Sequence, residues 1–162
     1  MQNTIKTYAP ILWIYGITFA IATILAFRFS YGFEPWMTSW MAGILIFFAL
    51  LKLFDVPAFA ADFSKYDLIA QNVPIYARTY PFIELGLGFM LLTGFIPFTI
   101  YGIILAVFSV GFAGVVRALR QGKDLQCACV GRILNLPLSK VAVYENGSMV
   151  VMAILMICGI FG

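Results

Sequence analysis

Five stretches of about 20 predominantly apolar residues constrain this chain more than any other feature of its sequence. They span residues 8–27, 35–54, 74–94, 96–116 and 141–161. A helix of about 20 residues is long enough to cross the roughly 30 Å hydrocarbon core of a bilayer. Lipid offers no hydrogen-bond partners, so backbone polar groups must be paired within each helix. The sequence therefore predicts an all-α integral membrane protein, a single domain (residues 1–162) with a bundle of about five transmembrane helices.

The composition indicates that lipid, rather than a protein interior, surrounds much of this apolar surface. Of the 162 residues, 63% are hydrophobic and only 10% are charged, whereas soluble domains have about 45–50% and about 25%. A chain this short has too little interior to bury so many apolar side chains. The absence of histidine excludes the commonest general base and transition-metal ligand. The net charge of +3 is sparsely distributed, so we expect no nucleic-acid partner.

The basic residues are divided unequally between the two sides that five crossings define. The side that holds the N-terminus and the connections 55–73 and 117–140 collects Lys6, Lys52, Lys65, Arg78, Arg117, Arg120, Lys123, Arg132 and Lys140. The other side has only Arg28. By the positive-inside rule, the crowded side and the N-terminus are cytoplasmic. In the first connection, aromatic residues at 59, 63 and 66 recur at helical spacing and predict a short helix in the membrane interface.

The second long connection contains the sharpest chemical motif, Cys127-Ala128-Cys129. Two thiols at this spacing can cycle between a dithiol and a strained, easily reduced disulfide. They can instead clamp a soft cation such as Cu(I) or Hg(II), for which thiolates are suited; we expect no other cofactor. The third interpretation is a pair of inert loop cysteines. Nearby basic residues would raise the thiolate fraction of either cysteine.

Glu84 is the second candidate, because it falls near the middle of the third apolar stretch. An ionised side chain at this depth costs several kcal/mol, so it should face the bundle interior and have a partner. The candidate partners are Lys52, Arg78 and Tyr80. The cluster would be either a proton relay or part of an ion path, or else a structural pair that fixes helix packing.

Four further residues receive simpler interpretations. Glu145 is expected in the first turn of the fifth helix, where a carboxylate complements the helix dipole. Lys52, if it does not pair with Glu84, would extend its ammonium to the interface. Pro81 removes a backbone donor and is expected to kink the third helix. Cys158 is expected to be a packing residue near the membrane face opposite the cysteine pair.

Several short motifs occur in the order and at the spacing that are typical of a known family. They are Lys52-Leu53-Phe54-Asp55, Tyr66-Asp67, Tyr80-Pro81-x-x-Glu84, Cys127-Ala128-Cys129-Val130-Gly131, Leu136-Pro137-Leu138-Ser139 and Glu145-Asn146. In these the chain resembles the MauE group of methylamine-utilisation proteins and the DoxX-like membrane proteins. The resemblance runs from about the second helix to the C-terminus. It implies a four-helix DoxX-like core plus an N-terminal helix, as in the MauE form.

The resemblance implies a multi-pass protein of the bacterial inner membrane that assists redox chemistry. MauE-type proteins are linked to disulfide formation during maturation of methylamine dehydrogenase, with a thioredoxin- or glutaredoxin-like partner. On this interpretation, Cys127 and Cys129 are the exchanging thiols. One departure is Val130, where the family usually has an aromatic residue. Related small membrane proteins with cysteine pairs serve in mercury uptake.

The sequence thus leaves three functions open. The first is thiol–disulfide exchange, and the second is transport or binding of Hg(II) or Cu(I) by the same thiols. The third is a non-catalytic membrane subunit, in which Gly86 and Gly88 allow close helix contact. In the first case the protein is either a thiol–disulfide oxidoreductase or an accessory protein, and a homo-oligomer is compatible with all three functions. Charge places the cysteines on the cytoplasmic side, whereas a periplasmic disulfide role requires access from outside.

Overall fold

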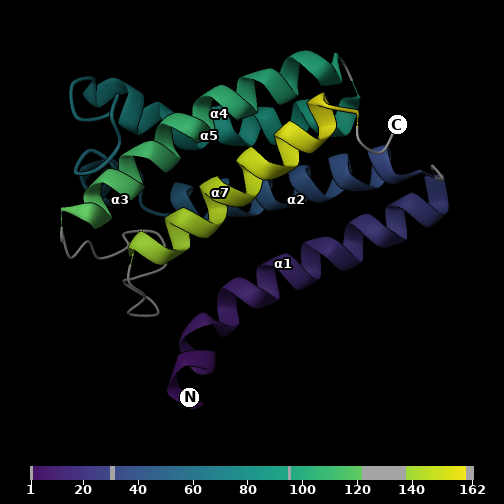
Figure 1. Ribbon diagram of the computed structural model, residues 1–162, viewed down its shortest axis with the longest axis horizontal. Helices are drawn as coiled ribbons and strands as arrows, with labels where there is room; N and C mark the ends of the chain where they lie inside the picture. The colour runs from purple at the N-terminus through teal and green to yellow at the C-terminus, as the bar shows by residue number, and fades with distance from the viewer. Residues whose placement is uncertain (1, 30–31, 95, 122–137, 160–162) are drawn as a thin grey trace.

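The computed structural model describes residues 2–29, 32–94, 96–121 and 138–159, which form six helices and no strand (Figure 1). Their bounds are α1 (Gln2–Phe29), α2 (Phe33–Leu53), α3 (Val56–Phe63), α4 (Pro74–Thr93), α5 (Pro97–Arg120) and α7 (Leu138–Ile157). The all-helical prediction is confirmed for this part of the chain. Cys127 and Cys129 lie outside the described residues.

The long helices follow the predicted apolar stretches, but several extend beyond them. α2 and α4 agree with the predictions to within two residues at each end. α1 begins six residues before the first stretch, α5 continues to Arg120, and α7 begins at Leu138 instead of residue 141. A helix need not end where its apolar stretch ends, because polar residues can continue the intrahelical hydrogen bonds. These extensions change which residues lie in the first and last turns.

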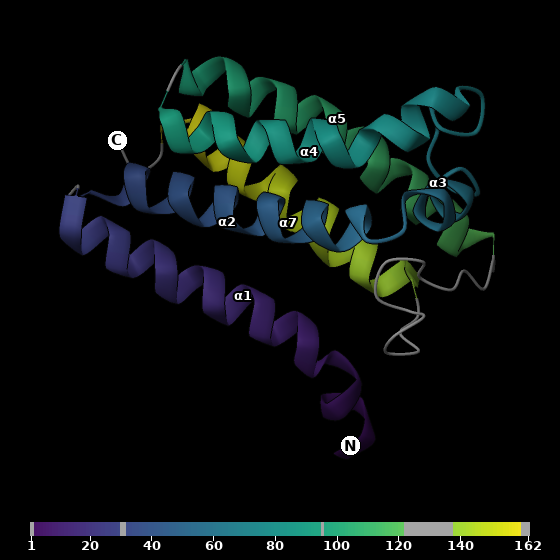
Figure 2. The same ribbon diagram turned by 180° about the vertical axis from the view of Figure 1, so that it is seen from behind.

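The helices form a bundle with α1 on its outside (Figures 1 and 2). α2 packs against α4, and α5 packs against α7. α4 also contacts α5, and α7 also contacts α2. α1 packs against α2, and its N-terminal half diverges from the rest (Figure 2). α3 is a short helix that packs on α4. The core therefore lies between α2, α4, α5 and α7.

The predicted short helix in the first long connection is present, but its aromatic face points inward. Phe59, Phe63 and Tyr66 are buried rather than exposed at an interface. The Phe63 ring centroid lies 4.5 Å from that of Tyr80 on α4, within the range of favourable aromatic contacts. Asp55 caps the helix by accepting a 3.0 Å hydrogen bond from the backbone N–H of Ala58. Aromatic packing against α4 thus decides the orientation that spacing alone left open.

The turn between α3 and α4 is fixed by a buried carboxyl group. Asp67 Oδ1 accepts hydrogen bonds from the backbone N–H groups of Ile69 and Ala70, at 2.9 and 2.8 Å. Burial raises the pKa of Asp67, and the two backbone hydrogen bonds partly offset that rise. A raised pKa means that folding favours the protonated carboxyl, so its ionisation above that pKa lowers the stability of this turn.

Two glycines allow close approach of neighbouring segments. A Cβ at Gly88 on α4 would lie 2.7 Å from Ile46 Cγ1 on α2. A Cβ at Gly114 on α5 would lie 2.5 Å from the carbonyl oxygen of Tyr66. The predicted role of Gly88 in helix packing is therefore confirmed. The same prediction for Gly86 is wrong, because a Cβ there would meet no atom within 4 Å.

The connections are divided between the two ends of the bundle (Figure 1). The α1–α2 and α4–α5 turns lie at one end. Gly94 ends α4 there with a left-handed φ of 65°, and Pro97 begins α5. α3, the C-terminus of α5 and the N-terminus of α7 lie at the other end. The exposed cations Lys65, Arg78, Arg117 and Arg120 belong to elements that meet there. We call it the cationic end.

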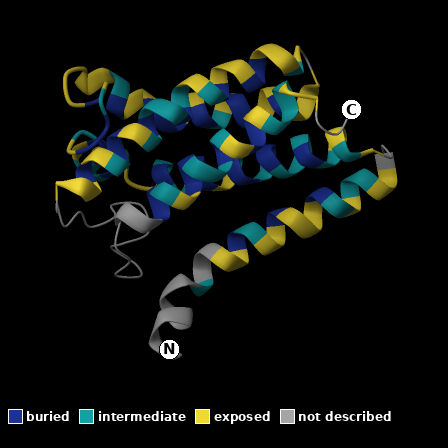
Figure 3. Ribbon diagram, in the orientation of Figure 1, coloured by how far each residue is buried: buried dark blue, intermediate teal, exposed yellow. Residues whose placement is uncertain are grey.

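Many exposed residues line the outside of the helices (Figure 3), and a large number of them are large apolar side chains. Two of the described helices, α2 and α5, are long and apolar enough to cross a membrane. Leu12–Arg28 of α1 and Val141–Ile157 of α7 are shorter apolar helical segments. Among the exposed large hydrophobic side chains are Leu12, Trp13, Phe27, Phe54, Ile75, Phe82, Phe89, Phe98 and Val151. Soluble monomers rarely expose large contiguous apolar patches.

Replacing Gly114 by Ala is expected to weaken docking of the α3–α4 turn on α5, because the added methyl group collides with backbone atoms. Overpacking of this kind costs about 1–3 kcal/mol. Gly102→Ala on the same helix is the matched control, since a Cβ there meets nothing within 4 Å. Thermal unfolding in detergent should show a lower midpoint for Gly114→Ala and an unchanged or higher midpoint for Gly102→Ala. Equal midpoints for the two variants would contradict the close approach.

Candidate functional site

Three ionisable side chains from three helices meet inside the bundle. Lys52 of α2 donates to Glu84 Oε2 of α4, with 2.6 Å between Nζ and the oxygen, and also to Glu145 Oε1 of α7. The side chains are only 6%, 1% and 7% exposed, respectively. We call these three residues the ion cluster. It joins α4 to α7 through the ammonium group of Lys52.

Helical periodicity places both carboxylates on core faces. The buried positions of α4 are Ala77, Tyr80, Pro81, Glu84, Leu87, Gly88 and Leu91. On α7, the buried positions are Val141, Ala142, Glu145, Asn146, Met149, Met152 and Ala153. Both sets follow the i, i+3, i+4 spacing of a single helix face. Each glutamate therefore replaces an apolar residue in an otherwise regular stripe.

Aromatic rings surround the ammonium group of Lys52. Its Nζ lies 5.3 Å from the ring centroid of Tyr80 and 5.8 Å from those of Phe48 and Phe59. A cation within about 6 Å of a ring centroid is attracted by the negative face of the ring. The rings also exclude water from the ion pairs. The ion cluster is thus held by two carboxylates and three aromatic side chains.

Asn146 continues the polar layer next to Glu145. Its Nδ2 donates a 2.7 Å hydrogen bond to the carbonyl oxygen of Ala142. The Oδ1 atom faces Gly111 on α5, where a Cβ would lie 2.6 Å away. α5 and α7 therefore pack closely only because position 111 carries no side chain. A second link ties α1 to α7, where the hydroxyls of Tyr15 and Ser148 are 2.7 Å apart.

The electrostatics of the ion cluster are unbalanced. One ammonium group faces two carboxyl groups, and Glu84 Oε1 is buried with no hydrogen-bond donor among the described residues. Burying charged groups costs several kcal/mol per ion, which paired charges recover only with good geometry. The described residues hold no group of three His, Cys, Asp or Glu side chains arranged for a metal ion. The arrangement therefore suits charge pairing and proton binding.

A separate cavity lies at the end of the bundle opposite the cationic end. It has a volume of about 600 Å³, and its lining includes Glu34, Thr38 and Tyr101. None of its lining residues belongs to the ion cluster. The two features are therefore independent.

The structure brings together some of the predicted site residues and separates others. Of the three candidate partners of Glu84, Lys52 forms an ion pair with it and Tyr80 packs beside that pair. Arg78 is exposed on α4 and is not part of the ion cluster. The prediction that Lys52 reaches the interface is wrong, because its ammonium group turns inward to two carboxylates. Helix α4 continues through Pro81, and the kink expected at this residue stays a prediction.

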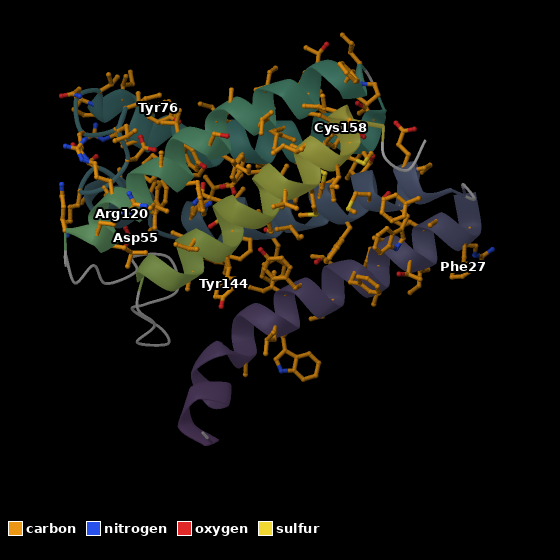
Figure 4. All side chains as sticks on the ribbon, viewed as in Figure 1. Phe27, Asp55, Tyr76, Arg120, Tyr144 and Cys158 are labelled. Carbon is orange, nitrogen blue, oxygen red and sulfur yellow. The ribbon has the colours of Figure 1, made fainter. Side chains whose placement is uncertain are left out.

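Two further predictions are corrected. Glu145 is not in the first turn of its helix, because α7 begins seven residues earlier at Leu138. The sequence feature that indicates a core position for Glu145 is its place in the apolar stripe of the fifth predicted helix. Cys158 is exposed rather than packed. It lies at the end of the bundle opposite Arg120 and Asp55, as Figure 4 shows.

Comparison with known protein families covers nearly the whole chain. A family described as methylamine utilisation protein MauE matches residues 8–159. The matched residues include the ion cluster and the cysteine pair. No curated protein and no solved structure matches the chain.

Replacing Lys52 by Met is expected to destabilise the bundle strongly, because two buried carboxyl groups would lose their common cation. Breaking a buried ionic cluster in this way costs about 3–5 kcal/mol. Lys65→Met is the matched control, since Lys65 is exposed and pairs with Asp62 at the surface, where a pair contributes about 0–1 kcal/mol. Thermal unfolding in detergent measures both variants. A Lys52→Met protein as stable as Lys65→Met would show that the ion cluster does not support the fold.

Proposed function

The chain belongs to the MauE family of methylamine utilisation proteins, and from this membership we propose that it is a multi-pass inner-membrane protein whose Cys127 and Cys129 exchange disulfides with a partner. The family is membrane-associated, and membership indicates an accessory role in methylamine utilisation. The proposed beneficiary is methylamine dehydrogenase during its maturation. The proposed partner is a thioredoxin- or glutaredoxin-like protein.

The multi-pass arrangement is supported by the distribution of apolar surface. α2 and α5 have the length and composition of membrane spans. Large apolar side chains are also exposed on α1, α4 and α7. In water this surface would favour aggregation, whereas in lipid it matches the solvent. We therefore propose five crossings, by α1, α2, α4, α5 and α7.

The proposed orientation rests on charge. Exposed cations of the described residues gather at the cationic end, and Arg28 lies near the other end. By the positive-inside rule, the cationic end and the N-terminus are cytoplasmic. α5 ends and α7 begins at the cationic end, and Cys127 and Cys129 fall between these two helices in the sequence. Arg117 and Arg120 lie in the last turn of α5, a few residues before Cys127 in the sequence, and positive charge favours the reactive thiolate.

The proposed chemistry is thiol–disulfide exchange. One thiolate of the pair attacks a disulfide of the partner, forms a mixed disulfide and releases the partner's other sulfur as a thiolate. The second cysteine then attacks the mixed disulfide, which closes the Cys127–Cys129 bond and releases the reduced partner. The reverse sequence transfers the disulfide to the partner. Two electrons and two protons pass between the proteins, so no separate oxidant is consumed in the exchange.

Replacing both Cys127 and Cys129 by Ser is expected to abolish methylamine-dependent growth, because Ser retains the size of Cys but cannot form a disulfide. Cys158→Ser is the matched control, since Cys158 lies at the end of the bundle opposite Arg120. Alkylation with a mass-tagged maleimide in native membranes, with and without reductant, reports the thiol state. We expect two additional tags after reduction in the wild type and in Cys158→Ser.

Two results would overturn the redox proposal. The first is a pair of thiols that stays free under both oxidising and reducing conditions. The second is full growth of the double variant, which would favour a non-catalytic membrane subunit. If the thiols stay free and vesicle uptake of Hg(II) or Cu(I) depends on them, the soft-metal function replaces disulfide exchange.

A further inference from the structure

The charge count of the ion cluster carries an inference that does not depend on the cysteine chemistry. With Lys52 protonated and both carboxyls ionised, the ion cluster has a net charge of −1. All three side chains are almost completely buried. An uncompensated charge at this depth costs several kcal/mol, because the Coulomb gain of one ammonium group is divided between two carboxylates.

The surroundings of the ion cluster supply no second cation among the described residues. α2 contributes Phe48 beside Lys52, and α3 contributes Phe59. α4 contributes the phenol of Tyr80, and α7 contributes the amide of Asn146. The phenol of Tyr15 on α1 is hydrogen-bonded to Ser148 of α7, and its ring packs against that of Phe48. Phenols and amides are uncharged near neutral pH, while Arg117 and Arg120 of α5 are exposed.

The geometry leaves one position for a proton. Glu84 Oε2 and Glu145 Oε1 are both occupied by Lys52. Glu84 Oε1 is buried without a donor among the described residues, and both carboxyl groups contact the same ammonium group. Two carboxylates that share a site cannot both ionise easily, because like charges repel in a medium of low dielectric. A single proton on this pair of carboxyl groups removes the net charge of the ion cluster.

We propose that the ion cluster is a proton-binding site that holds one exchangeable proton, shared by Glu84 and Glu145 and balanced by Lys52. Binding makes the ion cluster neutral and joins α2, α4 and α7. Release leaves a negative charge where α4 and α7 meet Lys52, and this charge weakens that junction. The bundle thus contains a proton site below its cationic end, since Glu145 lies about 10 Å along α7 from Leu138 at 1.5 Å per residue.

Infrared spectroscopy of the purified protein in lipid nanodiscs tests this proposal through the C=O stretch of protonated carboxyl groups. Difference spectra at neutral pH compare the wild type with Glu84→Gln and with Glu145→Gln. Gln reproduces the shape of a neutral carboxyl, so both variants should fold. Each variant leaves one cation and one carboxylate, which need no proton. We therefore expect both variants to lose the intensity of one protonated carboxyl.

The controls separate this proton from other carboxyl groups. Asp67 has a raised pKa because it is buried, so Asp67→Asn measures any contribution that this carboxyl makes to the spectrum. Glu34→Gln alters an exposed carboxylate and should change nothing. Loss of intensity in only one of the two cluster variants would assign the proton to one residue and overturn sharing. Unchanged intensity in both folded variants, verified by circular dichroism, would overturn the proposal altogether.

Discussion

The interaction on which the rest of the structure depends is the burial of one lysine between two glutamates. Lys52, Glu84 and Glu145 come from three helices that are far apart in the sequence, and their side chains meet away from water. A buried ionic group tolerates few alternative arrangements, because each misplacement leaves a charge without a partner. The ion cluster therefore constrains how α2, α4 and α7 can be rotated and shifted relative to one another.

The helices around the ion cluster fit because small residues stand where large ones would collide. Gly88 lets α4 approach α2, and Gly111 leaves room for Asn146 of α7. Aromatic packing completes the arrangement on the side of α3, where Phe63 meets Tyr80. Lipid-facing surfaces have little preference for one apolar neighbour over another, so close packing and polar contacts determine which helices associate.

The cysteine pair and the ion cluster differ in how far apart their residues lie in the sequence. The two cysteines are neighbours in the sequence, so their spacing alone indicates the chemistry that they can perform. Their proposed function rests on membership of the MauE family. The ion cluster is assembled from positions 52, 84 and 145, which lie in three separate motifs, so no single motif contains it. A proton site inside the bundle and an exchanging thiol pair would give the protein two separate chemical functions.

The sequence by itself determined the helical class, the approximate positions of the long helices and the need of Glu84 for a partner. These follow from apolar length and from the cost of burying charge, which act within one segment. Only the tertiary structure decided that Lys52 turns inward, that Arg78 does not join it and that Glu145 is the second carboxylate. The role of Glu145 was missed because helix α7 begins before its apolar stretch, and because pairing between distant helices depends on their packing rather than on local sequence.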